Sequence, residues 1–370
     1  MNTELEPSSS GMVVAWKVLA ILGSLYLFLV GVSGMGEAFK LFGREFAERT
    51  LSMTSNPVTG LFLGILATSL VQSSSTSTSI VVGMVAGGAI SLPGALPIIL
   101  GANIGTTITA FMVSLAYLNR PLEFERAYGA ALLHLVFNLI AVGILLPLEL
   151  ATGGLTWLAE GGTDLFSQMG GMHLTNPLKA ATQPAIDLLR VVLFDHAAAL
   201  LVATVALTFA TLVAIVKLLR SLVLKRIEGF FDRHLFRNWR RAMFFGFLLT
   251  VAVQSSSIPT SLAIPLAAAG ILKLIQVYPY NLGANVGTTI TAMLAALATG
   301  DRTAIVVAFA HLFFNLLGIV IIWGVPFLRS VPLQIAEWLA RRSLRCRVLP
   351  VALFVAVYFL IPLIFIILPI

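Results

Sequence analysis

Long apolar runs decide which class of fold is open to this chain. Each is close to the ~20 residues that a helix needs to cross a bilayer, and they lie at Met12–Val32, Ala127–Leu148, Val191–Val216, Ile305–Phe327 and Val348–Ile370. The runs are continuous and do not alternate with polar residues, which excludes a transmembrane β-barrel. Only 11% of the 370 residues are charged, whereas soluble domains carry about 25%. The sequence therefore predicts an all-α polytopic membrane protein.

The first apolar run is interpreted as a retained span. The segment before it, MNTELEPSSS, carries two glutamates and no basic residue, which is the wrong charge for the start of a signal peptide.

An internal repeat divides the chain into two related halves. Residues 71–110 and 253–292 align at a constant offset of 182, with 21 identities in 40 positions and no gap. VQSSS occurs in both copies, GANIGTTITA matches GANVGTTITA, and HLVFN at 134–138 matches HLFFN at 311–315. Agreement of this extent indicates a duplication.

Both copies have the same order of segments: a span, a charged interfacial stretch, a polar-broken segment, and two more spans. The polar-broken segments, at about 58–92 and 242–275, have apolar arms too short to cross comfortably. We expect each to form a re-entrant helical hairpin with QSSS at its tip. The predicted organisation is a first repeat over 1–150, an extracytoplasmic loop over 151–190, a second repeat over 191–330, and a basic cytoplasmic segment with a final transmembrane helix over 331–370.

Counting the crossings predicts that the two repeats are inverted in the membrane. If the hairpin does not cross, each copy has three spans, an odd number, so the copies must point in opposite directions. Residues 217–241 hold eight basic and two acidic residues, whereas the matching stretch of the first copy holds three of each. Basic loops collect in the cytoplasm. This rule also places RRSLRCR at 341–347 inside, the N-terminus inside and the C-terminus outside.

The QSSS segments are the candidate site for an anion. Polar residues inside a bilayer usually mark a pathway or site, and a broken helix exposes backbone N–H groups at its N-terminus. The residues expected to surround a tetrahedral oxyanion are Gln72, Ser73, Ser74, Ser75, Thr76, Gln254, Ser255, Ser256 and Ser257. Serines also mend helix breaks or allow close helix packing, but their recurrence in both halves favours a site.

The GAN blocks are the candidate site for a hard cation, which prefers oxygen ligands. Gly101, Gly105, Gly283 and Gly287 permit an unwound backbone whose carbonyls could bind sodium. The predicted sodium-binding residues are Asn103, Thr106, Thr109, Asn285, Thr288 and Thr291. The alternative is small-residue helix packing, with the asparagines as helix caps.

Two other features leave alternatives open. His134 and His311 occupy matching positions in spans, where they fit either an interhelical hydrogen bond or a proton role. A serine near a histidine also allows an intramembrane hydrolase, but the chain has no G-x-S-x-G elbow and repeats the serines in both halves. The sequence is therefore not expected to be that of an enzyme.

The paired QSSS motifs, each followed by a GANIGTT-like block and an H-x-x-F-N segment, resemble the sodium-dependent phosphate cotransporter family (type II) of animal kidney and intestine and its bacterial relatives. The resemblance runs from about Leu51 to the C-terminus. It implies sodium-driven uptake of inorganic phosphate by alternating access, with Gln72–Thr76 and Gln254–Ser257 at the phosphate and Thr288 and Thr291 at a sodium site. We therefore expect Ser74→Ala or Ser256→Ala to cripple uptake without preventing membrane insertion.

The same resemblance implies an inner-membrane protein of a bacterium, with sodium as coupling ion and no cofactor. The net charge of +7 does not indicate a nucleic-acid partner, because basic residues of membrane proteins collect in cytoplasmic loops. Animal members carry an aspartate where this chain has Leu135, a position that bears on whether transport is electrogenic. The expected outer loop is short and has no cysteine, as in a compact bacterial member. A phosphate exporter of the same fold is the alternative, because gradients set the direction of transport.

Overall fold

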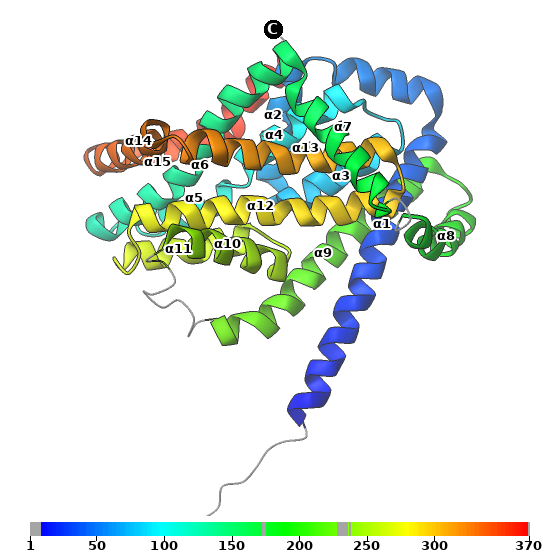
Figure 1. Ribbon diagram of the computed structural model, residues 1–370, viewed down its shortest axis with the longest axis horizontal. Helices are drawn as coiled ribbons and strands as arrows, with labels where there is room; N and C mark the ends of the chain where they lie inside the picture. The colour runs from blue at the N-terminus through cyan, green and yellow to red at the C-terminus, as the bar shows by residue number, and fades with distance from the viewer. Residues whose placement is uncertain (1–8, 172–174, 228–235, 237, 369–370) are drawn as a thin grey trace, which may run out of the picture.

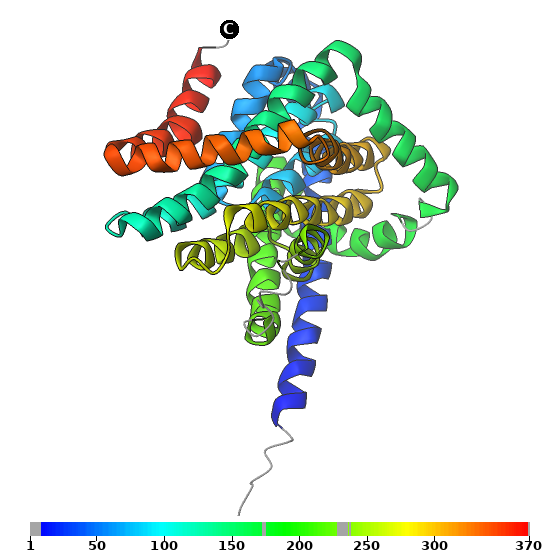
Figure 2. The ribbon, with the colours of Figure 1, turned by 60° about the vertical axis from the view of Figure 1, so that its left-hand side comes forward.

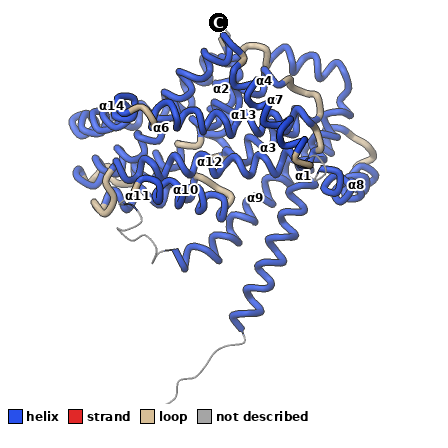
Figure 3. The backbone as a smooth tube through the Cα atoms, viewed as in Figure 1, coloured by secondary structure: helices blue, strands red, loops and turns tan. Residues whose placement is uncertain are grey.

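All regular secondary structure in the part of the chain that the structure describes is helical. The computed structural model describes residues 9–171, 175–227, 236 and 238–368, and Figure 3 shows only helices and loops there. The first half comprises α1 (Ser9–Met53), α2 (Pro57–Val71), α3 (Ser74–Ala86), α4 (Leu92–Gly105), α5 (Ile108–Leu115), α6 (Pro121–Thr152), α7 (Gly154–Gln168) and α8 (Thr175–Val192). The second half comprises α9 (Ala197–Ile227), α10 (Trp239–Val253), α11 (Ser257–Ala268), α12 (Leu274–Thr299), α13 (Arg302–Gly318) with the π-helical turn η3 (Ile319–Trp323), α14 (Pro326–Arg345), α15 (Val348–Val355), the π-helical turn η4 (Ala356–Leu360) and α16 (Ile361–Ile367).

Among the described residues, seven helical segments are long and apolar enough to cross a membrane. They are Met12–Gly43, Leu92–Leu115, Pro121–Thr152, Ala197–Leu219, Leu274–Thr299, Arg302–Trp323 and Val348–Ile367. This number equals three spans for each repeat and one at the end, and it confirms the all-α polytopic class. Of the basic stretch at 217–241, Arg233 and Arg237 lie outside the described residues.

The helices that carry the tips begin and end in the same way in both copies. The Asn56 side chain caps α2 by accepting from the backbone N–H of Val58 at 2.8 Å, and Asn238 caps α10 through the N–H of Arg240 at 2.9 Å. Asparagine is a preferred residue at this position because its side-chain oxygen accepts from unpaired backbone N–H groups. Both helices end in a left-handed glutamine, described below with the tips.

Glycines let α2 pack closely on α4, and α10 on α12. A Cβ on Gly101 would lie 2.0 Å from the Leu61 carbonyl oxygen, and one on Gly283 would lie 1.8 Å from that of Met243. These contacts match at the offset of 182, so the packing of the duplicated helices repeats residue by residue. Close backbone approach through small residues is typical of membrane helices.

The same packing corrects one sequence prediction. Gly283 and Gly287 lie inside the uninterrupted helix α12, and Gly101 lies inside α4, whereas Gly105 is the last residue of α4. The expectation of an unwound backbone is wrong for Gly101, Gly283 and Gly287, which allow close helix contact instead. Only the first copy has a break nearby, a turn at residues 106–107 between α4 and α5.

The prediction of a loop over 151–190 is also wrong. This segment forms α7 and most of α8. Gly153, at φ 63°, turns the chain from α6 into α7. The Glu149 carboxylate then caps α7 by accepting from the backbone N–H of Leu155 at 2.7 Å and of Thr156 at 3.1 Å. Asp164 of α7 pairs with Arg302 of α13 at 2.6 Å, an exposed ion pair between this segment and the bundle.

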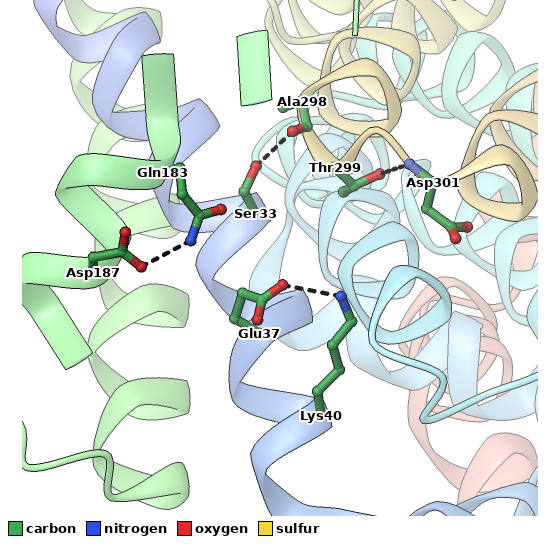
Figure 4. Close-up of polar contacts among 8 residues, drawn as sticks. All are labelled: Ser33, Glu37, Lys40, Gln183, Asp187, Ala298, Thr299 and Asp301. Atoms are coloured by element: carbon green, nitrogen blue, oxygen red, sulfur yellow. Dashed lines mark hydrogen bonds and ion pairs between the residues drawn. The ribbon is translucent and has the colours of Figure 1, made fainter. Parts of the chain in front are cut away.

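Helix α1 crosses the edge of the bundle and extends away from it at its N-terminal end (Figures 1 and 2). Its middle part packs on α9, since a Cβ on Gly31 would meet the Thr208 hydroxyl. Figure 4 shows the Ser33 hydroxyl donating to the Ala298 carbonyl at the end of α12, at 2.8 Å. The first span thus contacts both the equivalent span of the second copy and the helix that carries the second GAN block.

Candidate functional site

The two QSSS tips, 182 residues apart in the sequence, line one cavity. This tip cavity has a volume of about 310 Å³. It is lined by Val71, Gln72, Ser73, Ser75, Thr76, Gln254, Ser255, Ser257 and Ile258 from the tips, and by Phe209, Leu212, Val213, Val216 and Lys217 from α9. The tips also touch, because the Ser257 hydroxyl lies 3.4 Å from the Gln72 carbonyl oxygen.

The first tip is a sharp break between α2 and α3. Gln72 adopts the left-handed conformation at φ 57°, which ends α2. Ser73 then caps α3, because its hydroxyl oxygen accepts from the Thr76 backbone N–H at 3.2 Å and pairs with the Thr76 hydroxyl at 2.9 Å. Ser75 and Thr76 are buried, although both line the cavity. The break therefore directs neutral hydroxyls into the cavity.

The second tip has the same backbone and a different cap. Gln254 is left-handed at φ 54°, matching Gln72. The first residue of α11 is Ser257, and the residue before it, Ser256, makes no side-chain cap hydrogen bond. The backbone N–H groups at the start of α11 are therefore not capped by Ser256, and Ser257 and Ile258 both line the cavity. Unpaired N–H groups at a helix N-terminus favour an anion.

Seven of the nine predicted phosphate residues line the tip cavity, and two do not. Ser74 and Ser256 are matching residues of the repeat, and each is buried outside the lining. The predicted effect of replacing them stays a prediction. Their neighbours Ser75 and Ser257, which also match at the offset of 182, are the serines that reach the cavity from the two helix starts.

Sequence analysis missed the contribution of α9, and above all Lys217. Among the described residues it is the only charged side chain in the lining of the tip cavity, and the sequence indicated no role for it beyond that of one basic residue in a cytoplasmic stretch. A signal was present in the repeat. The residue that matches Lys217 in the first copy is Met35, which is fully buried. A lysine that replaces a buried methionine at a matching position breaks the symmetry on one side of the site.

The predicted sodium residues Asn103 and Asn285 connect the two halves instead of capping helices. Their side-chain oxygens lie 3.3 Å from Nε2 of His311 and 2.8 Å from Nε2 of His134, respectively. An amide oxygen only accepts, so Nε2 of each histidine is the donor. The interhelical hydrogen bond considered for these histidines is thus present in both copies.

These two bridges are not equal. Asn285 also donates from Nδ2 to Oδ1 of Asn138 at 2.9 Å, so that His134, Asn285 and Asn138 form one buried chain of hydrogen bonds. In the other bridge, the amide of Asn103 donates to the carbonyl of its own helix at Ile99. The duplicated residues therefore hold the halves together more firmly on one side than on the other.

The predicted sodium threonines are dispersed. The Thr291 hydroxyl donates to Oε1 of Gln254 at 2.8 Å, which connects α12 to the second tip. The matching hydroxyl of Thr109 is buried and has no hydrogen-bond partner among the described residues. Thr106 and Thr288 donate to carbonyl oxygens of their own helices. Among the hydrogen bonds that the described residues make, one connects a predicted sodium residue to a tip, that of Thr291.

Comparison with known protein sequences assigns the chain to a family. The Na+/Pi-cotransporter family matches residues 27–159 and 207–324, and each matched segment contains one QSSS tip. The chain belongs to this family. It is 32% identical to the sodium-dependent phosphate transport protein 2A of Ovis aries, an alignment that covers 94% of this chain and 66% of that protein.

Two other relatives give the same result. The 2A protein of Rattus norvegicus is 31% identical, over 94% of this chain and 66% of that protein. The 2B protein of Homo sapiens is 30% identical, over 94% of this chain and 64% of that protein. This chain thus spans slightly less than two thirds of its relatives' length. No solved structure matches it. All three relatives are named transport proteins, which argues against the hydrolase alternative.

Proposed function

We propose that the protein is a sodium-coupled symporter of inorganic phosphate, and that the phosphate binds between the two QSSS tips. The single observation that carries this proposal is the tip cavity, in which both copies of one sequence motif line the same space. Its donors are neutral hydroxyls, glutamine side chains and the uncapped start of α11. Such donors hold an anion without an ion pair, so they also allow its release.

Within the part of the chain that the structure describes, Lys217 supplies the one positive charge at this site. It lines the cavity from α9 and is exposed. A flexible ammonium group at the mouth of a cavity attracts a phosphate and raises its local concentration. We infer that Lys217 increases the affinity for phosphate and that the hydroxyls give the site its selectivity for a tetrahedral oxyanion.

We further propose that the two repeats are inverted and that transport proceeds by alternating access. The support comes from the odd number of spans in each copy, from the uneven distribution of basic residues, and from the repeated packing of α2 on α4 and α10 on α12. Inverted repeats with broken helices at matching positions are typical of secondary transporters, which bind substrate where the repeats meet. The N-terminus would then lie in the cytoplasm of a bacterial cell and the C-terminus outside.

For sodium, we propose a site next to the second tip. Thr291 and Gln254 already bring two side-chain oxygens within 2.8 Å of each other, and sodium prefers oxygen ligands. An ion bound there would compete for Oε1 of Gln254, a residue of the tip cavity, and so connect sodium binding to the phosphate site. Thr109, with its unpartnered hydroxyl, is the matching candidate in the first copy.

The test is uptake of radiolabelled phosphate into proteoliposomes that contain the purified protein. With sodium outside and potassium inside, phosphate should accumulate above its outside concentration. With potassium on both sides, accumulation should be absent. Uptake of phosphate that does not depend on sodium would refute the coupling. Loss of preloaded phosphate from the vesicles, driven by the sodium gradient and without any sodium-driven uptake, would favour the exporter.

A further inference from the structure

A second cavity, with basic residues in its lining, lies between the start of α6 and the C-terminal half of α14. This basic cavity has a volume of about 430 Å³ and shares no residue with the tip cavity. It is lined by Glu125 of α6 and by Trp338, Arg341, Arg342, Leu344 and Arg345 of α14. Figure 2 shows α14 passing alongside the first part of α6 before the chain turns into α15.

The sequence of α14 explains why this face is basic. Ala336, Ala340 and Ser343 recur at helical spacing and are buried, and a Cβ added at Gly129 of α6 would lie 3.7 Å from that of Ala340. Small residues at this spacing allow α14 to lie close to α6. Trp338 and the three arginines of the lining are exposed beside this contact. Helix α14 is not one of the seven candidate spans.

The charge of the basic cavity suits a phosphate group. Among the described residues, the lining holds three guanidinium groups and one carboxyl group, that of Glu125. The guanidinium group of Arg341 pairs with the carboxylate of Glu337 on the same helix, at 3.5 Å. Within the described residues, Arg342 and Arg345 make no ion pair. Planar guanidinium groups bind phosphate oxygens in pairs of hydrogen bonds.

The surroundings of the cavity are apolar, which distinguishes a lipid from a free ion. Trp338 is 60% exposed, Leu122 one turn before Glu125 is 70% exposed, and Val348 shortly after Arg345 is 71% exposed. An exposed tryptophan beside basic residues is typical of the membrane–water interface. A soluble phosphate gains nothing from this apolar surface, whereas the acyl chains of a lipid would cover it.

We propose that the basic cavity binds the headgroup phosphate of an anionic phospholipid. Arg342 and Arg345 bind the phosphate, and Trp338 lies at the level of the headgroup and acyl chains. Basic pockets between membrane helices on the cytoplasmic side bind anionic headgroups in this way. The site is separate from the tip cavity, so this proposal does not depend on the proposed transport activity.

Native mass spectrometry of the purified protein in detergent tests the proposal. The protein is titrated with dioleoyl phosphatidylglycerol and, separately, with dioleoyl phosphatidylcholine. We expect the unmodified chain to retain the anionic lipid in preference to the zwitterionic one. In Arg342→Gln/Arg345→Gln the affinity for phosphatidylglycerol should fall about 30-fold, from the loss of two arginines near an anionic phosphate.

The matched control is Arg240→Gln/Arg241→Gln, which removes the same charge from two exposed arginines at the start of α10. It should bind phosphatidylglycerol as the unmodified chain does. An equal loss in both double variants would show general attraction to basic protein and overturn the proposal. So would displacement of the lipid by excess inorganic phosphate, which would indicate a site for a soluble ion. An unchanged melting temperature without lipid shows that the variants fold.

Discussion

The bridge between His134, Asn285 and Asn138 allows a prediction whose size follows from the structure. Replacing Asn285 with leucine, which has a similar shape, removes two buried interhelical hydrogen bonds, of 2.8 Å to His134 and 2.9 Å to Asn138. Hydrogen bonds between membrane helices contribute about 0.6 kcal/mol on average and up to about 1.7 kcal/mol. Asn285→Leu should therefore lower the free energy of unfolding by about 1–3 kcal/mol.

The duplicated bridge supplies the matched control. Asn103→Leu removes one interhelical hydrogen bond, to His311, and its 3.3 Å length is beyond the usual range. It should cost about 0.6 kcal/mol or less. The assay is reversible unfolding by SDS in mixed micelles. The double variant His134→Phe/Asn285→Leu should be less destabilised than the sum of its single variants, by about 0.6–1.7 kcal/mol of coupling.

Two results would refute this reasoning. Equal destabilisation by Asn285→Leu and Asn103→Leu would show that the two bridges do not differ as their distances indicate. A coupling energy of zero between His134 and Asn285 would show that their contact does not stabilise the fold.

Three further predictions concern the charge, the sodium site and the helix packing. Lys217→Met, which introduces the residue of the first copy, should raise the KM for phosphate about 5-fold at low ionic strength and by less at high salt. Lys217→Arg keeps the charge and should leave the KM unchanged. A KM that Lys217→Met does not change would contradict the role given to the lysine charge. Thr291→Val should raise the sodium concentration for half-maximal uptake about 3- to 10-fold through loss of one hydroxyl, and Thr291→Ser should restore it. Gly283→Ala should lower the free energy of unfolding by about 3 kcal/mol or more, the upper end for overpacking, because its Cβ would meet the backbone of Met243. Gly143→Ala, where nothing lies within 4 Å, should be neutral or stabilising in the same SDS assay.

The sequence was sufficient to predict the helical class and a number of spans equal to the seven candidate spans among the described residues. An apolar run of bilayer length predicts a helix, because in lipid the backbone must make its hydrogen bonds within the segment itself. The duplication gave a second signal. A motif that recurs as VQSSS beside a helix break in both halves marks positions that a fold with two related units can bring together, as Gln72 and Ser257 are at the tips.

Other features were not accessible from the sequence, for physical reasons. Glycine serves both unwound backbone and close helix contact, so only the partner helix decides between them, as it does for Gly101 and Gly283. A histidine in a span likewise does not name its partner, and His134 finds it 151 residues away in Asn285. The helices α7 and α8 were missed because a segment that lies on the bundle need not be as apolar as a span.

Equilibrium binding of radiolabelled phosphate to the purified protein in sodium tests the central claim most directly, that both tips hold one anion. Ser75 and Ser257 enter the tip cavity from the two halves. We predict one phosphate bound per chain, with affinity reduced about 3- to 10-fold in Ser75→Ala and also in Ser257→Ala, the loss of one hydroxyl donor each. Two phosphates per chain, or full affinity in either variant, would contradict a single site between the tips.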